Sequence, residues 1–283
     1  MNRALAVPAA IALLVVAGCK NDFSPQSDLL GLRVLALRAR PLELAPGESV
    51  TVQATSYVPA GATVLSERWT FCPLSAGAVA AYACAVPQCE VELTPAPDGT
   101  VTANPTEIIA ACLGFPVGTI PAGVPDQILT VFRYRIATDL PASRDAVLQI
   151  PQWTRRPPPD PNLPPVIDQV LIGGRVVWEN GAPVGVPPLL PPNGLLPVEL
   201  RIDPASVQTY TDAAGVLQTE TMTGYFYTTA GTFSAGITTG VDTINDLEGT
   251  NLVAGQIAKV WIVALDLRGG QAVAGPIDVT VGP

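Results

Sequence analysis

"RRPPPDPNLPP", residues 155–165, decides how this chain is organised, because it places six prolines among eleven residues. Proline lacks the amide hydrogen that a strand donates to its neighbour, so such a run cannot lie inside a sheet and forms a stiff spacer. The run separates residues 32–154 from residues 166–283, and each segment has about the length of a β-sandwich domain. We therefore expect two domains joined by a proline-rich linker.

The segment before the linker carries the two-residue alternation of β-strands. In "LTVFRYRIAT" (129–138), the apolar residues Phe132, Tyr134 and Ile136 alternate with Arg133 and Arg135. One face of this strand should therefore be buried and the other solvated. Similar patterns predict further strands in this segment at 33–40, 50–55, 67–72 and 146–153.

One stretch of the first segment has helix signals instead. In "NPTEIIAACLG" (104–114), Asn104 can cap the helix, Pro105 suits its first position, Glu107 completes a capping box and Gly114 can end it. A short helix is expected here, inserted in an otherwise β domain.

The segment after the linker also reads as strands. The Asn-Gly pair at 180–181 predicts a hairpin, and "VELRID" (198–203) alternates cleanly. Residues 260–265 are apolar on both faces, as a central buried strand would be. The sequence thus predicts an all-β fold of two sandwich domains.

Composition excludes several classes of function. The formal net charge is −9, which disfavours a nucleic-acid partner. The chain has no histidine, which removes Ser-His-Asp and Cys-His catalysis and every His-ligated metal site. No serine lies in a Gly-x-Ser-x-Gly turn. The prediction is a protein without enzymatic activity, catalytic residues or cofactor.

The N-terminal region has the layout of an export signal. Arg3 precedes an uncharged apolar run at 4–17, which is shorter than the roughly 20 residues of a membrane-spanning helix. The run ends in "VAGC", residues 16–19, which resembles the lipobox of bacterial lipoprotein signals. An ordinary signal peptide and a retained helix are the alternatives.

The resemblance to lipoproteins implies a set of processing steps. Cleavage would follow Gly18, and Cys19 would carry a thioether-linked diacylglycerol and an acylated amine. Several acyl chains together anchor a protein stably to a membrane. Lys20, in place of an aspartate, implies sorting to the outer membrane. Residues 1–18 would be the signal peptide and residues 19–31 a lipidated tether, whose twelve extended residues from 20 to 31 reach about 40 Å.

With Cys19 assigned to lipid, an even number of cysteines is left. Cys72, Cys84, Cys89 and Cys112 are expected to form two disulfides, because an exported protein folds in an oxidising compartment. Three connectivities are possible, of which Cys84–Cys89 with Cys72–Cys112 is preferred. A zinc site with four cysteine ligands is the alternative that we disfavour.

Tryptophans offer a possible recognition surface. Trp153, Trp178 and Trp261 could line a sugar-binding platform, since indole faces stack on sugar rings. Their positions inside predicted strands favour core or interdomain packing instead. Trp69, close to Cys72, is expected in the core.

A calcium site is a second possibility. "GVDTINDLEGTN" (240–251) gathers Asp242, Asp246 and Glu248 in a predicted polar loop, and calcium binds several such oxygen ligands. The spacing does not match an EF-hand loop, so a solvated loop without metal is preferred.

A wider resemblance accompanies these patterns. "LELAPGESVTV" with "ERWTFCP" resembles the opening strands of bacterial immunoglobulin-like (Ig-like) domains, and "GYFYTTAGTF" with "KVWIVALDLRGG" resembles the closing strands of Ig-like and polycystic-kidney-disease-type domains. The whole arrangement is similar to outer-membrane lipoproteins of myxobacteria.

The resemblance implies a structural, adhesive or binding role in the cell envelope. The expected partners are the membrane, through the lipid, and an envelope protein or glycan. Carbohydrate- or calcium-dependent recognition is the first alternative, and an envelope hydrolase is the second.

Overall fold

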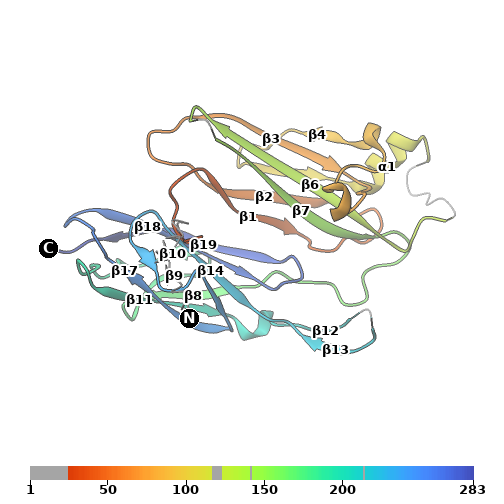
Figure 1. The fold of residues 1–283 in the computed structure, drawn as a ribbon. Coiled ribbons are helices and arrows are strands. Elements are labelled where there is room, and N and C mark those ends of the chain that lie inside the picture. Colours follow the sequence, from red (N-terminus) through yellow and green to blue (C-terminus); the bar gives the residue numbers. More distant parts are fainter. Residues whose placement is uncertain (1–24, 117–122, 141, 213) are drawn as a thin grey trace, which may run out of the picture.

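The structure is a computed structural model that describes residues 25–116, 123–140, 142–212 and 214–283. These residues form two β-sandwiches that lie side by side, the first above the second in Figure 1. The all-β prediction and the prediction of two β-sandwiches are confirmed. Residues 1–24, which include Gly18 and Cys19, lie outside the described residues.

The first sandwich pairs a sheet of order β1-β2-β5 with a sheet of order β4-β3-β6-β7. Each strand pair is antiparallel, and β6 with β7 forms the longest ladder. The strands are β1 (Arg33–Arg40), β2 (Val50–Tyr57), β3 (Val64–Cys72), β4 (Val91–Leu93), β5 (Thr100–Ala103), β6 (Gln127–Thr138) and β7 (Ser143–Trp153).

The second sandwich repeats this topology. Its strands β8, β11, β14, β16, β17, β18 and β19 occupy the same positions, with β8-β11-β17 in one sheet and β16-β14-β18-β19 in the other. Their bounds are β8 (Ile167–Ile172), β11 (Leu195–Ile202), β14 (Thr223–Thr228), β16 (Ile237–Thr239), β17 (Asp242–Glu248), β18 (Ile257–Leu265) and β19 (Gln271–Thr280).

Shorter strands extend this second unit. β9 (Arg175–Glu179) and β10 (Ala182–Pro183) form the hairpin that the Asn-Gly pair predicts, and they widen the sheet beside β8. β15 (Thr232–Phe233) pairs with β17, and β12 (Thr209–Thr211) with β13 (Leu217–Thr219) forms a separate projecting hairpin (Figure 1).

Each sandwich has its own apolar core. In the first, the alternation along β6 buries Phe132, Tyr134 and Ile136, as the sequence predicts, and Trp69 packs against Tyr134 with ring centroids 4.7 Å apart. In the second, Phe226 is fully buried beside β18, whose apolar run forms the predicted central strand. The two cores are separate clusters of side chains, so each sandwich buries its own apolar surface.

Helical structure among the described residues consists of α1 (Pro105–Leu113) and three short 3-10 turns, η1 (Ala78–Ala80), η2 (Pro87–Cys89) and η3 (Pro204–Ser206). The predicted caps of α1 are confirmed. The side chain of Asn104 accepts a hydrogen bond from the Glu107 amide at 3.2 Å, and Gly114 ends the helix with φ of 72°. The short helix is therefore inserted in the first sandwich at the expected place.

Two disulfides are present, but their pairing differs from the preferred one. Cys72 is bonded to Cys84, and Cys89 to Cys112, with Cα–Cα distances of 5.5 and 5.2 Å. The preference for Cys84–Cys89 was wrong, because α1 places Cys112 against η2, which carries Cys89. All four cysteines are thus accounted for by disulfides.

An apolar interface joins the sandwiches where β1 lies against β19 (Figure 1). Leu35 and Ala36 of β1 pack with Trp261 and Val263 of β18 in a cluster distinct from both cores. The rings of Tyr57 and Trp261 pack edge to face, with their centroids 5.7 Å apart. Trp261 is therefore an interdomain residue.

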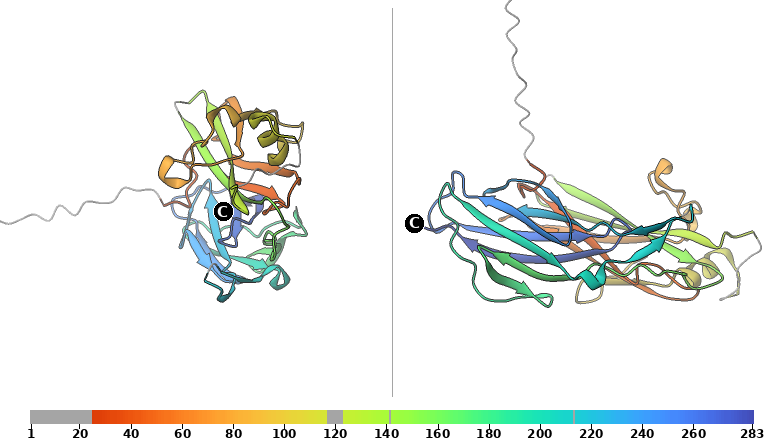
Figure 2. Two further views of the ribbon diagram at one scale, coloured as in Figure 1. Left: turned by 90° about the vertical axis from the view of Figure 1, so that its right-hand side faces the viewer. Right: turned by 90° about the horizontal axis from the view of Figure 1, so that it is seen from below.

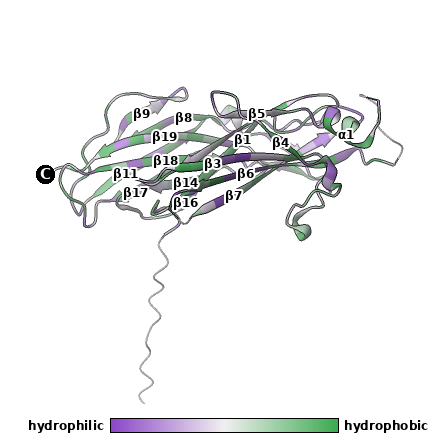
Figure 3. Ribbon diagram, turned by 90° about the horizontal axis from the view of Figure 1, so that it is seen from above, coloured by the Kyte–Doolittle hydropathy of each residue, from purple (hydrophilic) through white to green (hydrophobic). Residues whose placement is uncertain are grey.

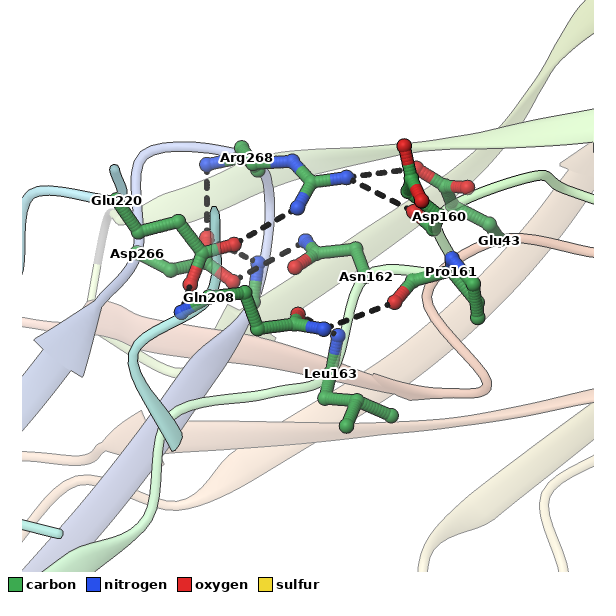
Figure 4. Close-up of polar contacts among 10 residues, drawn as sticks. Glu43, Asp160, Pro161, Asn162, Leu163, Gln208, Glu220, Asp266 and Arg268 are labelled. Atoms are coloured by element: carbon green, nitrogen blue, oxygen red, sulfur yellow. Dashed lines mark hydrogen bonds and ion pairs between the residues drawn. The ribbon is translucent and has the colours of Figure 1, made fainter. Parts of the chain in front are cut away.

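A polar network centred on Arg268, which we call the interdomain clamp, joins the same two units (Figure 4). The Arg268 guanidinium lies 2.9 Å from the Glu220 carboxylate of the second sandwich and 3.4 Å from the Glu43 carboxylate of the first. It also donates to the Asp160 carbonyl of the linker at 3.3 Å. One arginine therefore ties both sandwiches and the linker together.

The segment before β1 is also fixed. Residues 25–32 cross the second sandwich, where the Leu29 amide donates to the Thr228 carbonyl at 2.8 Å and the Thr228 amide donates to the Ser27 carbonyl at 2.9 Å. Ser27 and Leu29 are buried. The predicted tether to residue 31 was therefore too long, because the chain is already attached to the body at residue 27.

Candidate functional site

A cleft of about 550 Å³ lies between the two sandwiches, and we call it the interdomain cleft. One wall comes from β1, β2 and β5 of the first sandwich, and the other from β8, the β9–β10 turn and β19 of the second. Its volume falls in the range of small-molecule binding sites. The apolar interface and the interdomain clamp hold its two walls at a fixed distance.

The first wall presents two arginines. Arg38 and Arg40 lie two residues apart on β1, so both side chains point to the same side of the sheet, and both line the cleft. Arg38 donates to the Gln53 side chain at 2.5 Å, whereas its Nε is buried and has no hydrogen-bond partner among the described residues. Arg40 is exposed.

The charge of this wall is not neutralised within the protein. Neither Arg38 nor Arg40 forms an ion pair with any carboxylate of the described residues. Burial, together with the positive charge of Arg40, lowers the pKa of the Arg38 guanidinium. Two cations placed side by side with a buried unpaired donor form an environment that an anion would stabilise.

The second wall is polar and carries the opposite charge. Asp168 and Asp203 line it together with Asn180 and Trp178. The Asp203 carboxylate accepts a hydrogen bond from the Ala205 amide at 2.9 Å, which fixes its orientation. Acceptors on this wall can bind hydroxyl or ammonium groups of a ligand whose anionic group lies at the arginines.

Gln271 lies where the two walls meet. Its side-chain oxygen accepts a hydrogen bond from the Leu37 amide at 3.1 Å, so a residue of β19 completes the backbone pairing of β1. This contact joins the two sheets at the cleft and limits their relative movement.

The sequence does not reveal this site. Arg38 and Arg40 lie in a strand that the sequence predicts, and their two-residue spacing places them on one face. What covers that face depends on how the second sandwich lies against the first, which no local pattern encodes.

The structure favours the preferred expectation, core or interdomain packing of the tryptophans, over the alternative of a sugar-binding platform. Trp69, Trp178 and Trp261 are buried, with exposed fractions of 1%, 8% and 6%. Trp153 is half-buried, and the Arg156 guanidinium lies 5.2 Å from its ring centroid. No two of these indoles form an open stacking surface in the described part of the chain.

The predicted acidic loop is a strand, so the expectation of a loop was wrong. Asp242, Asp246 and Glu248 lie on β17 and share its outward face. At about 3.4 Å per residue, Asp242 lies roughly 14 Å along the strand from Asp246. They are not gathered around one point, and the described residues hold no cluster of three or more His, Cys, Asp or Glu that could bind a metal ion.

No helix within the described ranges is long and apolar enough to cross a membrane. The predicted lipidation site Cys19 and the cleavage position after Gly18 lie outside those ranges, and they stay predictions.

Comparisons with known proteins give only distant likenesses. No protein-family model matches the chain, and no curated protein matches it in sequence. Among solved structures, the D0–D1 domain of intimin is 11% identical, covers 88% of this chain and 99% of its own, and has a TM-score of 0.24.

Two further solved structures are similar to the same degree. The fibronectin(III)-like modules of Clostridium thermocellum CbhA are 9% identical, with coverage of 89% and 94% and a TM-score of 0.24. A Bacteroides ovatus protein, SGBP-B, solved in complex with a mixed-linkage heptasaccharide, is 11% identical, with coverage of 88% and 70% and a TM-score of 0.23. Likenesses this weak carry no argument about function, so the function is argued from the site.

Proposed function

We propose that this chain is a lipid-anchored cell-envelope protein whose interdomain cleft binds, without catalysis, a ligand that carries an anionic group. The observation that supports the binding role is the pair of arginines on β1. Arg38 and Arg40 line the interdomain cleft, have no carboxylate partner among the described residues, and leave one buried donor unpaired.

A carboxylate or phosphate is the ligand group that fits this wall. An anion between the two guanidinium groups would pair with both positive charges and offset the repulsion between the arginines. Hydroxyl or ammonium groups of the same ligand would bind at Asp168 and Asp203 across the cleft. Envelope glycans with acidic sugars and peptides with free carboxylates both have this chemistry.

The rigidity of the body favours a binding role. The interdomain clamp, the apolar interface and the Gln271 contact fix the two walls before a ligand arrives. A preformed site loses less conformational entropy on binding. The ligand therefore meets a cleft that needs little rearrangement.

Catalysis is not part of the proposal. Arginine keeps its proton, so the carboxylates of Asp168 and Asp203 are the candidate general bases of the cleft. Neither carboxylate accepts a hydrogen bond from a serine, threonine or cysteine side chain of the described residues. A nucleophile paired with a base, which covalent hydrolysis requires, is therefore missing from the described cleft.

Binding is tested with ligands of matched size and different charge. Oligosaccharides of uronic acids, neutral oligosaccharides of equal length, and peptides with free or amidated carboxyl ends are titrated calorimetrically. The anionic ligands should bind. Arg40→Gln should lower the affinity for them about tenfold, because a hydrogen bond to a charged group contributes roughly 1.5 kcal/mol. Arg144→Gln, an exposed arginine of β7, is the matched control. Equal affinity for charged and neutral members would reject the anion site.

The anchor is proposed from the sequence. The "VAGC" stretch supports lipidation of Cys19 after cleavage behind Gly18, and Lys20 supports sorting to the outer membrane. Cys19→Ala should move the protein from the membrane fraction to the soluble fraction of the envelope. Unchanged sedimentation with the membrane would contradict the lipid anchor.

A further inference from the structure

A disulfide-bonded loop of the first sandwich projects from the body, and we call residues 75–85 the apolar finger. Its sequence, "SAGAVAAYACA", contains no charged residue. Val79 at its tip is fully exposed, with a relative exposure of 105%. Alanines at 76, 78, 80, 81, 83 and 85 are exposed as well. A soluble protein seldom exposes an uncharged apolar projection unless that surface binds another protein, a ligand or a membrane.

A disulfide and hydrogen bonds fix the conformation of the finger. The Cys72–Cys84 disulfide closes its base, and the Ala76 amide donates to the Ala83 carbonyl at 2.8 Å. The Arg133 guanidinium donates to the Tyr82 carbonyl. The apolar tip is therefore presented in one conformation.

The lipid would lie close to the body. Ser27 is buried against the second sandwich, and it lies only eight positions after Cys19. Eight residues span at most roughly 27 Å. The acyl chains on Cys19 would therefore hold the side of the molecule that carries residues 25–32 near the bilayer.

The finger projects from that same side. Both views in Figure 2 show the red segment that starts the described chain and the orange finger on one side of the molecule. Figure 3 shows the apolar loop projecting in that direction, and β5 and β9, which border the interdomain cleft, at the opposite edge. Leu30, in the starting segment itself, is 72% exposed.

We infer that the apolar finger inserts into the bilayer surface to which the lipid anchors the protein. This inference rests on the proposed anchor at Cys19. The tip has no charge whose burial would oppose insertion, and Tyr82 at its base suits the membrane–water interface. The lipid and the finger are two attachment points, and together they fix the orientation of the body. The interdomain cleft then faces away from the membrane.

The test uses the full-length lipidated protein in vesicles of phosphatidylethanolamine and phosphatidylglycerol, with part of the lipid brominated on its acyl chains. Bromine quenches tryptophan emission by contact. Val79→Trp reports on the finger, and Val186→Trp, at a site 79% exposed next to the β9–β10 hairpin, is the matched control. The unsubstituted protein supplies the background of the four native tryptophans. Intact mass establishes whether Cys19 carries lipid.

In lipidated protein, emission from the tryptophan of Val79→Trp should shift to the blue in unbrominated vesicles and be lost in brominated ones. Emission from the tryptophan of Val186→Trp should stay unchanged in both. If the lipidated protein floats with the vesicles but both tryptophans stay unquenched, the inference that the finger inserts is overturned. The proposed lipid anchor is then unaffected. A blue shift without quenching would mean that a second copy of the protein, and not lipid, covers the finger. This outcome would also overturn the inference. Quenching that persists in Cys19→Ala protein would show that the finger reaches the bilayer without the lipid and would support the inference, whereas an intact mass without lipid in the unsubstituted protein would reject the anchor.

Discussion

Arg268 shows how much of the arrangement depends on one side chain. Its guanidinium pairs with Glu220, whose side chain is 0% exposed, and with Glu43, which is 15% exposed, and it lies 4.3 Å from the centroid of the Tyr210 ring. Burial raises the pKa of Glu43 although the Arg268 charge lowers it. A buried carboxylate and a half-buried one therefore depend on the same cation for their charge compensation.

Replacing this cation should be costly. Arg268→Met leaves Glu220 and Glu43 without their partner, and breaking a buried ion pair from one side costs about 3 kcal/mol of unfolding free energy. Urea denaturation measures the loss. Arg68→Met is the control, because Arg68 and Glu92 are 60% and 61% exposed and such a pair contributes less than about 1 kcal/mol. Equal losses in the two variants would contradict the role of the clamp.

Tyr134 predicts a dependence on alkaline pH. Burial raises the pKa of its phenol from 10.0 to about 12. Between these values the folded protein keeps a proton that the unfolded chain has lost, so stability falls as the pH rises through this range. Tyr134→Phe has no phenol to titrate, so it should lose less stability than the unsubstituted protein between pH 10 and 12. Urea midpoints of both proteins, measured below pH 10 and between pH 10 and 12, check this expectation. Identical pH profiles would show that Tyr134 does not contribute.

At the scale of elements, two β-bulges make the interface between the sandwiches. The pairing of β1 with β2 slips between Val34 and Ala36, and the pairing of β18 with β19 slips between Val260 and Ile262. A bulge turns its extra residue away from the normal alternation. Leu35 is the extra residue of the first bulge, whereas at the second bulge Gly275 and Pro276 of β19 lie opposite the single residue Trp261. Leu35 and Trp261 both belong to the interdomain cluster.

Glycine allows the second bulge to pack closely. Gly275 of β19 has φ of 125°, and a Cβ at this position would lie 2.6 Å from the Val260 carbonyl oxygen and 3.0 Å from the Trp261 Cα. A side chain there would push β18 and β19 apart. The strand pair therefore needs glycine beside Trp261.

Elements whose signals are local could be predicted from the sequence. The cap at Asn104, the stop at Gly114 and the alternation of Phe132, Tyr134 and Ile136 depend on neighbouring residues alone. β17 was misassigned as a loop because its inward positions include the polar residues Thr243 and Asn245, which hide the alternation. Asn245 is buried with its amide paired to the backbone of Ala235, a contact that no local pattern reveals.

The disulfides depend on more distant packing. Cys89 and Cys112 meet because α1 lies against η2, so their pairing could not be chosen from spacing. A disulfide that spans 23 residues stabilises by about 3 kcal/mol through the entropy of the unfolded chain. Replacing both cysteines with serine should cost this amount in urea denaturation. Peptide mass spectrometry without reduction should find Cys89 linked to Cys112, and a Cys84–Cys89 link would contradict the structure.

At the scale of the whole molecule, the sequence predicts two sandwiches but not how they lie together. A proline-rich linker is consistent with domains in a row or side by side. The side-by-side arrangement arises from contacts far apart in the chain, such as Leu37 with Gln271 and Glu43 with Arg268. The interdomain cleft exists only because of these contacts, so the candidate site could not be predicted before the fold was known.

This arrangement predicts that one substitution can part the sandwiches without unfolding them. Leu35→Asp places a carboxylate in the interdomain cluster, where Leu35 is 7% exposed, and burying an unpaired charge costs several kcal/mol. Separation of the domains exposes the carboxylate to water, and each sandwich keeps its own core.

Small-angle X-ray scattering should therefore show a longer maximum dimension for Leu35→Asp, while its circular dichroism stays that of a β protein. Leu65→Asp, at a site 67% exposed on β3, should leave both measurements unchanged. Because Arg38 and Asp168 would then no longer share a cleft, the opened variant should also lose affinity for an anionic ligand. A fully folded Leu35→Asp protein with an unchanged scattering curve would show that the apolar cluster does not hold the sandwiches together, and loss of the β signal would show that they do not fold independently.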